Sequence, residues 1–278
     1  MKKPVVVYSS WLENNYNTIL QQKEYAICSN RLAQKAGYET ILYTDKKSKS
    51  ILNDIPFNKI INFDENVLNQ LPKTIWAAAK ILAFSLQETP FMHLDFDFFI
   101  LKNNFYNKIK DKSFFVFHEE PWVKIFEDPI YNYGIKKILE KINNELDLNL
   151  TTETRSLNFS IFGTCQNEVI PVIKKQSNSI INLLIKYKQV LESHEFTQHF
   201  NKHFETLSCV LPSVIIEQIF LPNLIMQELK TPYYPILQIH NADRLMEQSK
   251  INSLIHLWGC KNIGKIDSLI KKYNNKHK

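Results

Sequence analysis

Two aspartates lie one residue apart in the sequence PFMHLDFDFFILK, residues 90–102. Asp95 and Asp97 interrupt an apolar, aromatic run, where an unpaired buried charge would cost several kcal/mol. If the run is a β-strand, residues i and i+2 share a face, so the two carboxylates project together. A hard divalent cation such as Mg²⁺ or Mn²⁺ between such oxygens relieves their repulsion. The spacing therefore predicts a metal site that could hold a diphosphate, and the alternative is an ordinary pair of strand-end residues that cap a turn.

The elements that must position this pair alternate between strand and helix. We expect strands at 4–10, 39–45, 59–64 and 90–102, and helices at 14–36 and 73–88. This order predicts an α/β fold with a mostly parallel central sheet flanked by helices.

The second half is less regular. We expect strands at 113–120 and 158–164, a helix over 131–146, two or three helices between 167 and 227, and short extended pieces at 233–240 and 253–259. We interpret residues 1–278 as one domain with two halves, 1–120 and 121–278; the resemblance described below implies a nucleotide-binding role for the first half and an acceptor-side role for the second.

The carboxyl ends of parallel strands meet at one edge of a sheet, where open α/β folds bind ligands. Tyr8 and Ser9 end the first predicted strand, and Asp45 ends the second. We therefore expect these three residues to contact the base and ribose of a nucleotide.

Composition narrows the class of protein. The 278 residues are 44% hydrophobic, enough for a sizeable core, and contain five glycines with neither a GxGxxG nor a GxxxxGK motif. This argues against dinucleotide-dependent redox enzymes and P-loop NTPases. The four cysteines are scattered, and no apolar run reaches the roughly 18 residues of a membrane span, so we expect a cytoplasmic protein with at most peripheral membrane contact.

The net charge of +6 would suit an anionic substrate such as a nucleotide sugar. The lysine-rich tail KKYNNKHK is interpreted as a solvated terminus, with a membrane or nucleic-acid patch as the alternative, and no nucleic-acid partner is expected.

The stretch HLDFDFFI, preceded by WAAAKILAF, resembles the DxD region of nucleotide-sugar-dependent glycosyltransferases of the GT-A fold. It is most similar to a bacterial group with a W-x-x-x-K helix before a P-F-x-H-x-D-x-D strand, and the likeness covers mainly residues 73–101. The resemblance implies that Asp95 contacts the ribose and the metal, and that Asp97 ligates the metal. Trp76 and Lys80 match the upstream helix, so Lys80 would face the donor phosphates or sugar; the alternative is a solvated lysine.

Later fragments extend the resemblance. HLWGCKN is similar to the H-x-x-G-x-x-K segment of retaining, family 8-type enzymes but is one residue shorter. It implies that His256 completes the metal shell and that Lys261 holds the diphosphate; a structural histidine is the alternative.

NFSIFGT implies that Asn158 and Gly163 line the sugar and acceptor side, although Ser160 stands where glycine is common. Glu217 and Gln218 would lie near the acceptor, or would be a pair on a helix surface.

The sequence and the resemblance together predict a metal-dependent glycosyltransferase of the hexosyltransferase kind. Its donor would be a nucleoside-diphosphate sugar, with UDP favoured and Mn²⁺ or Mg²⁺ as the metal, and its acceptor an unknown glycan, lipid-linked or protein group, in a setting such as bacterial surface polysaccharide assembly. The expected catalytic residues are Asp95, Asp97, Glu217 and Lys261.

The shortened late segment favours retention of configuration, whereas inversion would need a carboxylate base such as Glu119 or Glu217. Two alternatives stay open: a sugar-phosphate nucleotidylyltransferase, and a non-catalytic protein of the same fold that binds nucleotide sugars.

Overall fold

The computed structural model describes residues 3–12, 16–101, 103–124, 126–203, 211–237 and 254–256. In chain order the elements are β1 (Val5–Ser10), α1 (Tyr16–Lys35), β2 (Thr40–Thr44), α2 (Lys46–Leu52), β3 (Lys59–Asn62), α3 (Glu65–Leu68), α4 (Ala78–Ser85), β4 (Phe91–Leu94), β5 (Phe98–Ile100), η1 (Asn103–Phe105), α5 (Tyr106–Ile109), β6 (Phe115–Lys124), α6 (Pro129–Lys141), β7 (Arg155–Thr164), η2 (Asn167–Val169), α7 (Ile170–Lys186), α8 (Lys188–Leu191), α9 (His194–His203), α10 (Leu211–Ile215), η3 (Ile216–Phe220), α11 (Leu221–Leu229), β8 (Tyr234–Leu237) and β9 (Leu254–His256).

The centre of the fold is a 7-stranded sheet in the order β3-β2-β1-β4-β7-β6-β8. Strands β3, β2, β1 and β4 pair in parallel, and so do β6 and β8. Among these seven strands only β7 runs against the others, because it pairs antiparallel with both β4 and β6. The predicted α/β class with a mostly parallel sheet and flanking helices is therefore confirmed.

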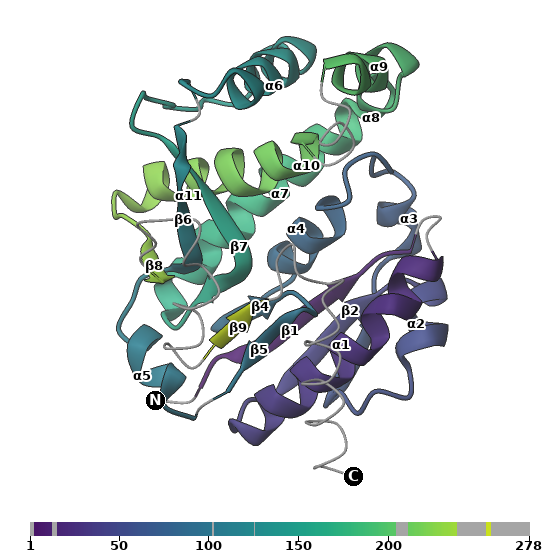
Figure 1. Cartoon of the computed structure of the whole chain (residues 1–278), viewed down its shortest axis with the longest axis vertical. Helices are drawn as coiled ribbons and strands as arrows, with labels where there is room; N and C mark the ends of the chain where they lie inside the picture. The colour runs from purple at the N-terminus through teal and green to yellow at the C-terminus, as the bar shows by residue number, and fades with distance from the viewer. Residues whose placement is uncertain are drawn as a thin grey trace.

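Helices cover both faces of this sheet (Figure 1). α1 and α2 lie on one face, over a core that includes Val6, Tyr8 and Leu42. α4, α7 and α11 lie on the other face, over a core that includes Val7 and Phe162. Val6 and Val7 enter different cores because neighbouring strand residues point to opposite faces. Among the helices of the described residues, none is both long and apolar enough to span a bilayer.

Aspartates begin three of the helices. The side chains of Asp45, Asp64 and Asp128 accept backbone N–H groups in the first turns of α2, α3 and α6, and thereby satisfy donors that a helix start leaves without partners. α2 and α3 are absent from the sequence-based expectation, although their capping aspartates were a signal for them.

The stretch predicted as one strand over 90–102 is two strands with a turn between them. β4 ends at Leu94, and the backbone N–H of Phe98 bonds to the carbonyl of Asp95 at 3.0 Å to close the turn before β5. The premise that Asp95 and Asp97 share a strand face is therefore wrong, since both lie in the turn that leaves β4. We call residues 95–97 the acidic turn.

Candidate functional site

The acidic turn lies at the point where the sheet reverses its strand order. The chain runs outward from β1 to β2 and β3, and then returns to place β4 on the other side of β1. Adjacent parallel strands whose connections leave in opposite directions create a crevice at their carboxyl ends, which is where open α/β sheets bind ligands. Ser9 at the end of β1 and Asp95 after β4 both stand at this edge.

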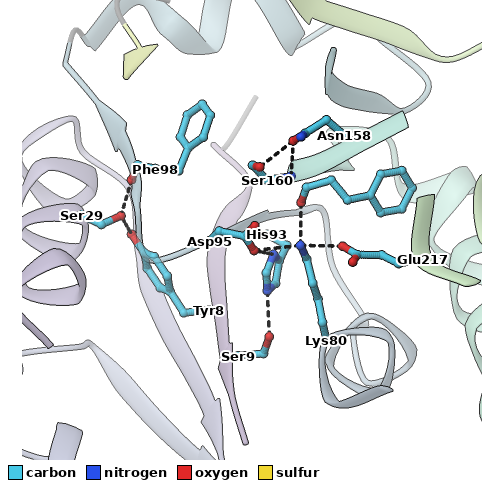
Figure 2. Close-up of polar contacts among 11 residues, drawn as sticks. Tyr8, Ser9, Ser29, Lys80, His93, Asp95, Phe98, Asn158, Ser160 and Glu217 are labelled. Carbon is cyan, nitrogen blue, oxygen red and sulfur yellow. Dashed lines mark hydrogen bonds and ion pairs between the residues drawn. The ribbon is translucent and has the colours of Figure 1, made fainter. Parts of the chain in front are cut away.

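Lys80 is the centre of the candidate site (Figure 2). Its Nζ donates to Asp95 Oδ1 at 2.8 Å and to the carbonyl of Phe159 at 2.8 Å, and it forms an ion pair with Glu217 Oε1 at 2.6 Å. A lysine ammonium has three N–H donors, and three oxygens surround this one. Lys80 therefore holds the acidic turn and is neither the solvated lysine nor the phosphate ligand of the sequence-based interpretations.

Two local irregularities aim the oxygens at Lys80. Between Val116 and His118 of β6, the paired residue on β7 jumps from Phe162 to Asn158, so β7 carries a bulge over 159–161. A bulge interrupts ladder pairing, and here the carbonyl of Phe159 accepts from Lys80, while that of Ser160 accepts the N–H of Asp95.

The second irregularity is a π-helical turn. η3 supplies Glu217, and such a turn is a common way to re-aim a side chain at a functional position.

Charge and burial act together on this group. Burial alone would lower the pKa of Lys80, but Asp95 and Glu217 outweigh it and leave the pKa raised, so the ammonium stays charged. Glu217 is fully buried, which raises its pKa against the opposing effect of Lys80. Asp95 is the most open member, with 31% of its side chain exposed. A ligand would therefore meet Asp95 and not Glu217. Both expectations for Glu217, a catalytic residue near the acceptor and a member of a pair on a helix surface, are corrected because its side chain is fully buried.

His93 joins the two strands beneath the acidic turn. Its Nε2 lies 3.0 Å from Ser9 Oγ across the β1–β4 boundary, and its ring packs edge-on against Phe84 of α4. Burial, followed by the charge of Lys80, lowers the pKa of His93 to about 3, so the ring is neutral. This geometry gives His93 a structural role and leaves Ser9 as a positioning partner at the edge.

Two predicted nucleotide contacts are corrected, because both side chains are buried and bonded within the protein. Tyr8 is fully buried on the α1 face, where its hydroxyl meets Ser29 Oγ at 2.9 Å and its ring stacks on Phe96. Asp45 Oδ1 accepts the N–H of Leu12 while the carboxylate caps α2, so it fastens the loop after β1.

Gly163 is needed for strand packing. A Cβ built at this position would lie 2.1 Å from the carbonyl of Phe91 on β4. Its role is close approach of β7 to β4, and sugar contact is not required to explain it.

Two further predicted residues, Asn158 and Trp76, lie near the site, and Glu119 does not. Asn158 is buried near the site, and its Oδ1 accepts both the N–H and the hydroxyl of Ser160. Trp76 lies just before α4 and is 46% exposed, and the start of α4 lies at the carboxyl edge because the helix leads back to β4. Glu119 points elsewhere: it pairs with Arg155 at 3.2 Å and accepts from the Tyr233 hydroxyl.

Sequence reasoning missed Glu120, which is buried on β6, where burial raises the pKa of its carboxyl group to about 7. Its only signal was its place beside Glu119 in the acidic end of that strand. The carbonyl of Phe159 was also missed, because a backbone group carries no side-chain signature.

Asp95 and Asp97 bring two carboxylates, the donors that Mg²⁺ or Mn²⁺ prefers, to the acidic turn, where Asp95 is partly open and Asp97 is buried at 7% exposure. In the described part of the chain, no group of three or more Asp, Glu, His or Cys side chains lies close enough together to hold a metal ion. The predicted third ligand, His256, lies in β9, whose backbone pairs with β5 and places His256 opposite Phe98. Its side chain, and the whole of Lys261, lie outside the described residues.

Fold and site together define an α/β protein with an acidic turn at the switch point of its sheet. The chain belongs to the family described as "Family of unknown function (DUF6734)", whose model matches residues 3–272. No curated protein matches it in sequence.

Two solved structures of glycosyltransferases are similar in fold. A galactosyltransferase, LgtC, in complex with donor and acceptor sugar analogs aligns with a TM-score of 0.40 and 10% identity, over 75% of this chain and 82% of that one. Mouse xyloside xylosyltransferase 1, in its apo form, aligns with a TM-score of 0.39 and 13% identity, over 91% and 93%. Similarity at this level does not assign an activity to this chain.

Proposed function

We propose that this protein is a metal-dependent glycosyltransferase that moves a sugar from a nucleoside-diphosphate sugar, a UDP-sugar in the favoured case, to a hydroxyl acceptor. The observation that carries the proposal is the acidic turn at the sheet's switch point, held in place by a buried lysine. The resemblance of HLDFDFFI and its upstream helix to the DxD region of GT-A enzymes supports it.

In this proposal Asp95 and Asp97, completed by His256, hold Mn²⁺ or Mg²⁺. The metal supplies charge that stabilises a departing diphosphate. Lys80 binds Asp95 from the protein side and offsets its charge, and Glu217 in turn pairs with Lys80. Ser9 and Trp76 line the donor side, Asn158 lies toward the acceptor side, and Lys261 faces the diphosphate. Residues 1–120 thus provide the nucleotide side, and residues 121–278 the acceptor side.

The test is nucleotide binding with and without Mn²⁺, followed by thermal unfolding. A nucleotide at 100 times its Kd stabilises the folded state by about 2.7 kcal/mol, which raises Tm by about 5 °C in a chain of this size. We expect this rise with UDP and Mn²⁺ together and its loss in Asp97→Asn. The control is Asp54→Asn, since Asp54 pairs with Lys23 on the surface and the substitution should leave the rise intact.

Equal UDP affinity of Asp97→Asn and wild type in Mn²⁺ would contradict the metal site. Incubation with UDP- and GDP-sugars then separates the functions. Slow hydrolysis of one donor supports the transferase, whereas tight binding without turnover indicates a binding protein. Activity on a nucleoside triphosphate with a sugar phosphate indicates a nucleotidylyltransferase.

A further inference from the structure

An exposed tryptophan lies at the start of α4, the helix that carries Lys80. Among the described residues, the large hydrophobic side chains that are exposed are those of Trp76, at 46%, and Leu86, at 44%. They lie at opposite ends of α4, since Trp76 comes just before the helix and Leu86 caps its last turn. In the described part of the chain, Trp76 is therefore the one exposed large apolar side chain at the carboxyl edge of the sheet.

The core fixes the backbone on both sides of Trp76. Ile75 and Ala77 are fully buried. The N–H of Ile75 bonds to the carbonyl of Pro72 at 3.0 Å, and the N–H of Ala78 bonds to the carbonyl of Ile75 at 3.0 Å. An ordered backbone thus holds the indole outward, and the protein loses little conformational entropy when a ligand covers it.

The segment before Trp76 also bonds to the second half of the chain. The Thr74 hydroxyl donates to the carbonyl of Leu191 at 3.0 Å, and the N–H of Lys73 donates to Glu192 Oε1 at 2.6 Å. α4 itself lies on the sheet face that α7 and α11 cover, away from α1 and α2 (Figure 1). Trp76 therefore stands where the half with the acidic turn meets the other half.

The open carboxylate of the site lies at the same end of α4. Lys80 follows Trp76 by about one helical turn, and helical side chains lean toward the start of their helix. The Lys80 ammonium meets Asp95 Oδ1 at 2.8 Å, and 31% of the Asp95 side chain is exposed. An exposed indole and a partly exposed carboxylate thus share the start of this helix.

This combination matches the two surfaces of a sugar ring. A pyranose has hydroxyl groups around its rim and C–H groups on its faces. Carboxylate and backbone oxygens accept hydrogen bonds from hydroxyl groups, and the electron-rich face of an indole attracts C–H groups over a large flat area. A nucleobase can stack on an indole as well. The junction of the two halves favours the sugar, because a transferred sugar must reach both the nucleotide and the acceptor.

We propose that Trp76 is a binding residue that stacks on the apolar face of a pyranose ring, either the sugar of the donor or a sugar of the acceptor. The place of this contact in the reaction rests on the proposed function. Binding of a pyranose to the indole does not itself require a nucleotide, so the contact and the function are tested separately.

The first test follows the indole directly. In ¹⁵N-labelled protein, the Nε1–H resonance of Trp76 is assigned by its absence in Trp76→Phe, since the chain has four tryptophans. UDP, UDP-hexoses and methyl hexopyranosides are then added in turn, with Mg²⁺ as a diamagnetic metal. We expect the resonance to shift with ligands that carry a hexose and to stay in place with UDP alone. A shift with a UDP-hexose identifies the donor sugar, and a shift with a methyl hexopyranoside identifies an acceptor sugar.

The second test measures affinity by calorimetry in Mn²⁺. We expect Trp76→Ala to bind the hexose-bearing ligand about tenfold more weakly than the wild type, as the loss of one aromatic contact predicts, and to bind UDP unchanged. Trp76→Phe should retain most of the affinity because it keeps an aromatic face. Leu86→Ala is the matched control: it removes an equally exposed apolar side chain from the other end of the same helix and should bind as the wild type does.

An indole resonance that responds to no hexose-bearing ligand overturns the proposal. Loss of UDP affinity in Trp76→Ala as large as the loss of UDP-hexose affinity also overturns it, because the indole would then contact the base. A protein whose Trp76 binds methyl hexopyranosides but which binds no UDP with either metal would support this inference and refute the proposed function. Hydrolysis of a UDP-hexose with equal kcat/KM in Trp76→Ala and wild type would support the proposed function and overturn this inference.

Discussion

Lys80 shows how a single side chain can change role once its surroundings are known. By sequence it is a lysine on an amphipathic helix near a DxD motif. In the structure three oxygens surround its ammonium, and one of them belongs to a carboxylate with no solvent exposure. A buried ion pair adds little net stability when it is intact, but removing one partner leaves an uncompensated charge in the interior. Replacing Lys80 should therefore destabilise the fold and displace Asp95 in the site.

Lys80→Met is expected to lower the free energy of unfolding by about 3–5 kcal/mol near pH 8, because Glu217 would lose its counter-charge in the core. Urea denaturation measures this. The double variant Lys80→Met/Glu217→Leu should recover much of the loss, since it removes both charges. Lys23→Met, at a partly exposed ion pair with Asp54, should cost less than about 1 kcal/mol. A Lys80→Met protein as stable as the wild type would show that Glu217 is not ionised beside the lysine.

At the scale of elements, β7 shapes the site. It crosses behind the acidic turn, runs opposite to its neighbours, and carries the bulge whose carbonyls bind Lys80 and Asp95. Its close contact with β4 depends on Gly163, since any side chain there would collide with the backbone of Phe91. Gly163 sets the distance between the two strands, and the bulge turns the carbonyl groups toward the lysine.

Gly163→Ala should separate β4 from β7 and destabilise the protein by about 3 kcal/mol, in the range of other overpacked sites, as measured by urea denaturation. The displacement should reach the acidic turn, so UDP binding in Mn²⁺ should weaken as well. Gly37→Ala is the comparison: its φ of +80° favours glycine, and the cost should stay near 1 kcal/mol without an effect on nucleotide binding. Normal stability of Gly163→Ala would mean that the strands can move apart freely.

The elements were more predictable from sequence than their contacts. β1, β2 and α1 follow from apolar patterns and agree with the expected ranges within a few residues. The acidic turn was not foreseen, because the aromatic run through Asp95 and Asp97 has the pattern of one continuous strand and contains no glycine or proline after Pro90. Its closure by a backbone bond from Phe98 depends on packing, and propensity does not encode that bond.

The site was predictable in its parts but not in its connections. Asp95 was singled out by type and spacing, and Lys80 and Glu217 were singled out by the resemblance. Their convergence depends on a β-bulge and a π-helical turn, both of which are set by tertiary contacts. Strand alternation alone could have separated Ser9 from Tyr8, since neighbouring residues face opposite sides and the two could not both line the edge.

At the scale of the whole molecule, two buried groups bias stability in opposite directions as pH changes. His93 has a pKa of about 3 in the folded state against 6.5 when unfolded, so its contribution falls as pH drops from 6.5 to 3. Glu120 has a pKa of about 7 against 4.5, so the folded state binds the extra proton, and its contribution falls as pH rises from 4.5 to 7. Between pH 4.5 and pH 6.5 the effects of the two groups on the free energy of unfolding change with pH in opposite directions and cancel.

The free energies of unfolding of two variants should show the pH dependence due to each group separately. Relative to wild type, Glu120→Gln should become progressively more stable from pH 4.5 to 7, by at most about 3 kcal/mol. His93→Gln should lose relative stability from pH 3 to 6.5, because the wild type regains there what protonation of its histidine costs. Urea denaturation at a series of pH values measures both. Parallel curves for wild type and Glu120→Gln would show that Glu120 titrates like an exposed acid.

The long span of chain between Lys80 and Glu217 also bears on how the protein is made. When the ribosome has produced the first parallel strands and α4, the lysine has only Asp95 nearby, and the bulge and η3 still lie ahead in the chain. Contacts so distant in sequence form late and slow the folding of a domain. In the nascent amino-terminal half Lys80 therefore has Asp95 as its counter-charge, and docking of η3 later adds Glu217 and completes the core around the lysine.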